Sequence, residues 1–108
     1  MKICNPLFRT DMPDPDIIRV GDNFYMVSTT MFYMPAAPIL KSADLKHWQI
    51  ASYICHSIAD NDIYQLRNGR NAYGKGQWAT SLMRYQERFY ACFVCHDMKK
   101  TYLFSTDD

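Results

Sequence analysis

"DIIRVGDNFYMVSTT", residues 16–30, contains two runs rich in apolar, β-branched and aromatic residues, separated by a turn that begins at Gly21. Short runs of this composition around a glycine-containing turn are typical of a β-hairpin, because glycine supplies the positive φ that a tight hairpin turn prefers. Two further runs of similar character follow at 37–42 and 48–55. The stretch therefore predicts a meander of four short antiparallel strands.

The remainder of the chain begins with a polar segment and then returns to strands. Residues 56–77 are rich in turn-forming residues, so we expect a long connecting loop there. Loops of this length are usually functional or disordered. Strands are predicted again at 79–85, 88–96 and 100–106.

The two halves of the chain share an internal repeat. A Phe-Tyr pair lies at 24–25 in the second predicted strand, and it recurs at 89–90 in the second strand of the other half. A repeated four-stranded meander is the signature of a β-propeller blade, although two unrelated hairpins of similar composition would also give this spacing. The repeat predicts an all-β fold with one blade at about 14–55 and an incomplete second blade at about 78–108. We expect the missing fourth strand to leave apolar flanks that favour self-association.

Charge and hydropathy argue against several classes of partner. Twelve basic and eleven acidic residues give a net charge of +1, and no basic block is present, so we expect neither nucleic acid nor an anionic membrane as a partner. The longest apolar stretch, at 89–95, is far shorter than the roughly 20 residues of a spanning helix. The first residues lack the apolar core of a signal peptide, which predicts a cytoplasmic location.

Asp14 is the first candidate for catalysis. In "MPDPDII", residues 12–18, it stands between Pro13 and Pro15. The two prolines fix their own φ and disfavour helical backbone before them, so we expect an extended, rigid mount for the carboxylate at the start of a strand. Such a carboxylate is suited to general-base catalysis, and the alternative is ordinary turn chemistry.

Other polar residues are weaker candidates for chemistry. The remaining loop carboxylates are expected to cap or form turns: they are Asp11, Asp16, Asp60, Asp62 and Glu87. Cys92 and Cys95 have odd spacing and would point to opposite faces of a strand, so they could not chelate one ion together. We therefore expect no metal and no cofactor.

Two aromatic stretches are candidates for a sugar-binding wall. "MFYMP", residues 31–35, lies between the second and third predicted strands, and "GKGQWAT" brings Trp78 to the start of the second repeat. Core packing is the alternative for each of them, and Trp48 is better placed as a packing residue.

Taken together, these motifs resemble glycoside hydrolase family 43. Members carry a P-D-P-x-[IV] stretch, an S-T-T or S-T-F loop, an S-x-D-L-x-x-W turn and a later G-x-W-A-[PA] motif. The corresponding residues here are "PDPDI", "STT", "SADLKHW" and "GQWAT". The resemblance runs from about residue 5 to 108.

The resemblance implies a five-bladed β-propeller and an inverting enzyme that acts on xylose- or arabinofuranose-containing oligosaccharides. By position, Asp14 matches the general base, and Met31, Trp78 and Ala79 match residues that line the subsite for the terminal sugar. The sequence does not choose between xylose and arabinofuranose.

Three departures from the family pattern limit this reading. The regions that carry the family's second Asp and its general-acid Glu do not occur in these residues, so the 108-residue chain is expected to be inactive. "RYQERFY" lacks the usual turn glycine, which predicts an altered hairpin or register around Met83 and Arg84, and Thr80 replaces the usual Pro or Ala without expected consequence. The alternatives are a non-catalytic truncated product, a half-propeller that associates with itself or a partner chain, and a sugar-binding module without hydrolysis.

Overall fold

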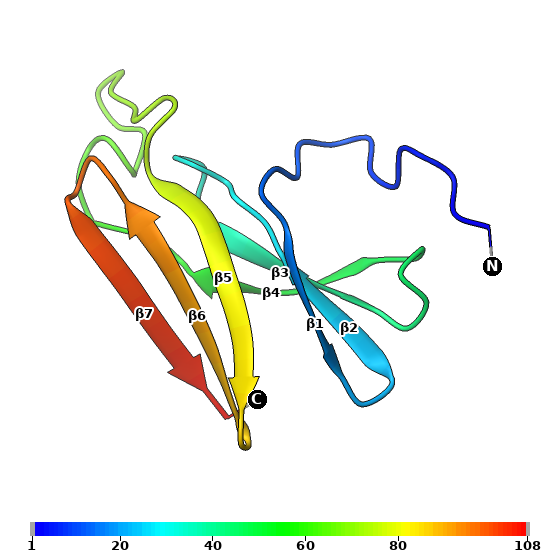
Figure 1. Cartoon of the computed structure of the whole chain (residues 1–108). Helices are drawn as coiled ribbons and strands as arrows, with labels where there is room; N and C mark the ends of the chain where they lie inside the picture. Colours follow the sequence, from blue (N-terminus) through cyan, green and yellow to red (C-terminus); the bar gives the residue numbers. More distant parts are fainter. Residues whose placement is uncertain (1, 108) are drawn as a thin grey trace.

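The computed structural model describes residues 2–107, which form seven strands in two antiparallel sheets. The strands are β1 (Asp16–Val20), β2 (Asn23–Val27), β3 (Ala36–Ser42), β4 (Gln49–Cys55), β5 (Gln77–Tyr85), β6 (Arg88–Cys95) and β7 (Lys100–Thr106). The first sheet has the order β1-β2-β3-β4 and the second has the order β5-β6-β7 (Figure 1). Every strand predicted from the sequence is present, and the bounds agree within two residues except that β2 ends at Val27, three residues before the predicted end at residue 30.

The first sheet is a simple meander. Gly21 has a φ of 59° in the turn between β1 and β2, which is the role predicted for it. Side chains of β1 alternate between half-buried and exposed, as expected when one face of a strand packs against a neighbour. Most of β4 is exposed, so this strand forms the outer edge of the sheet.

The repeat is confirmed by the equivalent positions of the aromatic pairs. Phe24-Tyr25 and Phe89-Tyr90 are the second and third residues of β2 and β6. In both sheets the first strand begins at the same end of the molecule (Figure 1), where Met31 in the segment after β2 pairs with Gln77 at the start of β5. This common end is where the predicted site residues lie.

The two sheets are joined by an apolar cluster and by one carboxylate. Val27, Ala37, Leu82 and Ala91 are buried together between the sheets. Asp16 of β1 accepts a hydrogen bond from the backbone N–H of Leu82 in β5, at 2.8 Å. Asp16 therefore connects the sheets, a role that differs from the turn or cap expected for it.

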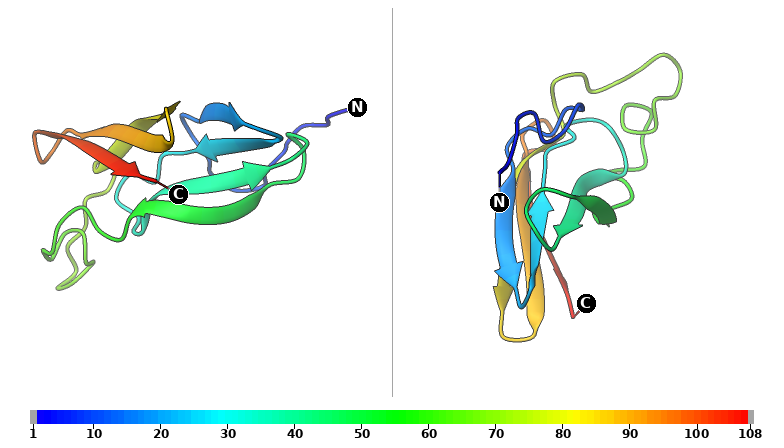
Figure 2. Two further views of the ribbon diagram at one scale, coloured as in Figure 1. Left: turned by 90° about the horizontal axis from the view of Figure 1, so that it is seen from below. Right: turned by 90° about the vertical axis from the view of Figure 1, so that its right-hand side faces the viewer.

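The segment between β4 and β5 forms an ordered loop with its own core. It projects beyond both sheets in each view (Figure 2), and its residues Tyr64 and Ala72 are buried against Phe32 and Cys95. Burial of apolar side chains explains why this turn-rich segment takes a defined conformation.

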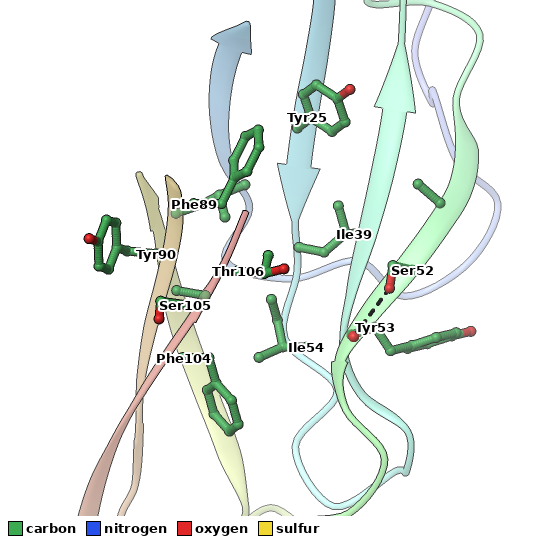
Figure 3. Close-up of a pocket in the computed structure, with 13 residues that line it drawn as sticks. Tyr25, Ile39, Ser52, Tyr53, Ile54, Phe89, Tyr90, Phe104, Ser105 and Thr106 are labelled. Atoms are coloured by element: carbon green, nitrogen blue, oxygen red, sulfur yellow. Dashed lines mark hydrogen bonds between the residues drawn. The ribbon is translucent and has the colours of Figure 1, made fainter. Parts of the chain in front are cut away.

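A groove of about 550 Å³ lies between β4 and the second sheet (Figure 3). Aromatic and aliphatic side chains such as Tyr25, Ile54, Phe89 and Phe104 line it. The lining residues include no carboxylate and none of the four predicted site residues, so the groove is separate from the candidate site.

Of the two alterations predicted around Met83 and Arg84, the change of register is not observed, and the unusual feature is the hairpin turn. Met83 and Arg84 pair with Tyr90 and Phe89 in regular register. The turn uses Gln86 at a φ of 54° in place of glycine. The irregularity in this sheet lies instead between Trp78 and Ser81.

Candidate active site

Asp14 lies just before β1, but its backbone is not extended as predicted. Its φ is 50°, which is the left-handed region that Asp tolerates better than most residues. The backbone around Asp14 is held by tertiary hydrogen bonds in addition to the two prolines. The carbonyl oxygen of Pro13 accepts hydrogen bonds from the Thr29 backbone N–H at 3.0 Å and from the Ser28 hydroxyl at 2.7 Å.

The Thr29 hydroxyl connects Asp14 to the second sheet. It donates to Oδ2 of Asp14 at 3.1 Å and accepts a hydrogen bond from the backbone N–H of Ala79 at 2.8 Å. Thr29 is 3% exposed, whereas Asp14 is exposed, so a buried hydroxyl orients a carboxylate that water can reach. Hydrogen bonds to a carboxylate are stronger than those between neutral groups.

Met31 is fixed to the start of β5 by a two-way backbone pairing. Its N–H donates to the Gln77 carbonyl at 3.1 Å, and the Gln77 N–H donates to the Met31 carbonyl at 2.9 Å. Gly76 packs so closely that a Cβ at this position would overlap the Met31 carbonyl oxygen. The pairing therefore needs glycine before Gln77.

The side chain of Gln77 is fully buried and forms hydrogen bonds that link the segment after β2 to β5. Its Oε1 accepts a hydrogen bond from the Thr30 N–H, and its Nε2 donates to the Thr80 hydroxyl, both at 2.7 Å. Thr80 is 2% exposed. The departure at Thr80 that was expected to have no consequence thus provides the acceptor for a buried amide.

Backbone strain is concentrated where the segments that hold Asp14 and Met31 meet the start of β5. Asp14, Met31 and Ala79 have φ values of 50°, 54° and 43°. Non-glycine residues in this region of φ cost free energy and often accumulate at functional sites, where surrounding structure holds them in place. The strain is direct evidence that the fold enforces a particular backbone at three of the four predicted site positions.

The structure brings all four predicted site residues together. Asp14 and Ala79 are both hydrogen-bonded to the Thr29 hydroxyl. Met31 pairs with Gln77, the residue directly before Trp78. Trp78 is 40% exposed, so part of its ring is available to a ligand. An accessible carboxylate beside apolar and aromatic surface can activate water next to a sugar ring.

Sequence reasoning missed the residues that hold the site together, which are Thr29, Gly76, Gln77 and Thr80. The glycine of "GKGQ" was the one available local signal, because a glycine directly before a strand can mark a close backbone approach.

Most other carboxylates are engaged in local structure. Arg67 pairs with Asp60 and Asp62 at 3.1 and 3.2 Å. A hydrogen bond from the Asn68 side chain is the main cause that lowers the pKa of Asp62. Glu87 lies in the hairpin turn, as predicted, and pairs with Arg84 at 2.8 Å.

The cysteines and histidines form no evident metal centre. Cys95 is buried and Cys92 is half-buried, and no disulfide joins the four cysteines. Across residues 2–107 no group of three or more His, Cys, Asp or Glu side chains is placed to hold a metal ion. Over the same range, no helix is long and apolar enough to cross a membrane.

Two propeller-type sheets with an exposed carboxylate and aromatic surface at one end are features of a propeller glycosidase. The family model described as "Glycosyl hydrolases family 43" matches residues 3–108. The chain belongs to this family.

Curated relatives support the assignment. A non-reducing end alpha-L-arabinofuranosidase of Bacteroides ovatus is 37% identical over 86 residues, which are 80% of this chain and 16% of the relative. A beta-xylosidase of Formosa agariphila is 34% identical over 89 residues, or 82% of this chain and 15% of the relative. The chain thus spans about one sixth of the length of these relatives.

Solved structures give the same result for the fold. A structure described as a bifunctional GH43-CE protein of Bacteroides eggerthii has a TM-score of 0.91 and 37% identity, and the match covers 98% of this chain and 14% of that one. The predicted fold class, two blades of a five-bladed β-propeller with the second blade incomplete, is confirmed. The roles of Asp14, Met31, Trp78 and Ala79 stay predictions.

Proposed function

We propose that this chain supplies the general base and part of the terminal-sugar subsite of a glycoside hydrolase that acts on xylosides or arabinofuranosides. The observation that carries the proposal is the exposed Asp14 carboxylate, held by the buried Thr29 hydroxyl beside Ala79. Relatives named as arabinofuranosidase and beta-xylosidase support this substrate class.

In the proposed mechanism Asp14 accepts a proton from a water molecule, which attacks the anomeric carbon from the face opposite the leaving group. Inversion requires a second carboxyl group about 6.5–9.5 Å away, to protonate the leaving oxygen and leave room for the water. Met31, Trp78 and Ala79 would contact the sugar and exclude solvent around it.

The general acid is proposed to come from residues outside these 108. Among the carboxylates described, Asp16 accepts a bond from Leu82, and Asp60, Asp62 and Glu87 form ion pairs. We therefore expect the 108-residue chain to show negligible turnover of nitrophenyl β-xyloside and α-arabinofuranoside. Robust turnover that Asp14→Asn abolishes would show that the acid lies within the chain.

A chimera tests the base directly. Residues 3–108, the range that the family model matches, would replace the corresponding segment of the Bacteroides ovatus relative, which supplies the rest of a longer chain. Asp14→Asn should lower kcat by about 10²–10⁴, the range typical of general-base catalysis. Asp22→Asn, in the exposed turn after β1, is the matched control and should retain activity. Proton NMR of the first-formed sugar anomer reports inversion or retention, and an active Asp14→Asn chimera would refute the assignment.

A further inference from the structure

The carboxylate of Asp97, which is not one of the four candidate site residues, accepts hydrogen bonds from buried side chains. Asp97 follows β6, and its Oδ2 accepts a hydrogen bond from the Tyr64 hydroxyl at 2.6 Å. Its Oδ1 accepts from the Cys95 thiol at 3.3 Å. Tyr64 is 3% exposed and Cys95 is fully buried, and both belong to the apolar cluster that contains Phe32.

One contact of Asp97 leads directly to the site. Oδ1 also accepts a hydrogen bond from the backbone N–H of Gly76 at 2.9 Å. Gly76 precedes Gln77, whose backbone pairs in both directions with Met31. Because a Cβ at Gly76 would overlap the Met31 carbonyl oxygen, the position of Gly76 determines how closely these two segments approach.

The interactions around Asp97 favour the ionised form of its carboxyl group. Desolvation by itself would raise the pKa of Asp97, but the hydrogen bonds from Tyr64, Gly76 and Cys95 outweigh it and the pKa is lowered. Tyr64 moves the other way: desolvation and its bond to Asp97 raise its pKa, so it stays protonated and continues to donate. Hydrogen bonds to an ionised acceptor are roughly twice as strong as neutral ones.

We propose that Asp97 is a positioning residue for the candidate sugar subsite, because its carboxylate anchors Gly76 and thereby sets the backbone of Met31, Trp78 and Ala79. Asp97 acts through its hydrogen bond to the Gly76 backbone and contacts no substrate. The name of the subsite rests on the proposed function, whereas the coupling between Asp97 and Met31 is a property of the 108-residue chain alone.

Amide hydrogen exchange measured by NMR tests this coupling without any sugar. In Asp97→Asn, the N–H groups of Met31 and Gln77 should exchange about tenfold faster or more, the effect of losing one charge-assisted hydrogen bond. Amides that pair β1 with β2 should change much less. Asp60→Asn, which removes an exposed carboxylate from the loop between β4 and β5, should leave the Met31 and Gln77 rates unchanged. Unchanged rates in Asp97→Asn, or an equal increase across all strands, would overturn the proposal.

A second variant carries the test if Asp97→Asn does not fold. Tyr64→Phe keeps the carboxylate and its bond to Gly76 but removes the donor that orients it. We expect a shifted Gly76 amide resonance and faster exchange at Met31 and Gln77, and exchange identical to that of the wild type would overturn the proposal. An inactive chimera would count against the proposed hydrolase without altering these exchange rates, so the two failures are distinguishable.

Discussion

The hydroxyl oxygen of Thr29 lies 3.1 Å from Oδ2 of Asp14 and, on its other side, accepts the N–H of Ala79. One buried side chain therefore links the candidate base, which lies before the first sheet, to the first strand of the second sheet. The orientation of the carboxylate and the packing of the two sheets depend on the same group.

Replacing Thr29 by valine tests this dual role. Thr29→Val keeps the shape but removes the hydroxyl, which leaves the Ala79 N–H without its acceptor. We expect a loss of about 1–2 kcal/mol in the free energy of unfolding, measured by urea denaturation. Thr29→Ser retains the hydroxyl and should lose less, so equal losses for the two variants would contradict the proposed link.

The strands and the position of the candidate site could be predicted from local sequence. The Phe-Tyr pairs, the turn at Gly21 and the apolar runs are short-range signals, and they located each strand within three residues. Local chemistry selected Asp14 and Trp78, through the prolines around the first and the aromatic stretch around the second, and the resemblance to family 43 gave each of them an expected role.

The hydrogen bonds that assemble the site could not be predicted from local sequence patterns. Thr29 and Ala79 are 50 residues apart, and Thr30 and Gln77 are 47 apart, so their hydrogen bonds depend on how the sheets pack. The backbone of Asp14 was predicted incorrectly for the same reason. The preference for extended backbone before Pro15 is local, whereas the bonds from Ser28 and Thr29 to Pro13 are tertiary contacts that accompany the left-handed conformation.

A pair of glycine substitutions separates backbone strain from steric overlap. Gly74 and Gly76 have φ values of 68° and 95°, but a Cβ meets open space at Gly74 and the Met31 carbonyl at Gly76. Gly74→Ala should cost about 1–2 kcal/mol from conformation alone. Gly76→Ala should cost about 3 kcal/mol or more because the Met31 pairing must also shift. Urea denaturation compares the two, and equal costs would show that the approach to Met31 can relax.

Gln86 offers a stabilising substitution. It has a φ of 54° in the β5–β6 turn, where an L residue pays about 1–2 kcal/mol that glycine avoids. Glycine loses some of this gain, about 0.5–1 kcal/mol, through the greater freedom of the unfolded chain. Gln86→Gly should therefore raise the free energy of unfolding by about 0.5–1 kcal/mol, with Gln86→Ala close to the wild type. A thermal melt that shows Gln86→Gly to be less stable than Gln86→Ala would contradict this account.

Asp44 predicts a pH dependence of stability. Hydrogen bonds from the backbone and ring of His47, followed by the Lys46 N–H, hold the pKa of its carboxyl well below the ordinary 3.8. Because the folded pKa is the lower one, the unfolded chain binds the proton more readily as the pH falls. The stabilisation is therefore complete above about pH 5 and is lost progressively below pH 4.

The measurement compares the wild type with Asp44→Asn in urea at several pH values. The wild type should be the more stable protein near neutral pH, and its advantage should shrink between pH 5 and pH 2. Asp62 and Asp97, whose pKa values are also lowered, remain in both proteins and cancel from the difference. An advantage that stays constant over this range would refute the role of the Asp44 charge.

The edge of β7 predicts self-association of the isolated chain. Among the described strands, β7 pairs with β6 alone, and Leu103 on this strand is 69% exposed. An open strand edge with exposed apolar side chains can pair with a second copy of the same chain. Light scattering should show a mass that rises with concentration, and Leu103→Lys should lower it because charge on an edge strand opposes pairing. Tyr73→Lys, which alters an exposed ring in the loop, is the matched control. A wild-type chain that stays monomeric at all concentrations would refute association through β7.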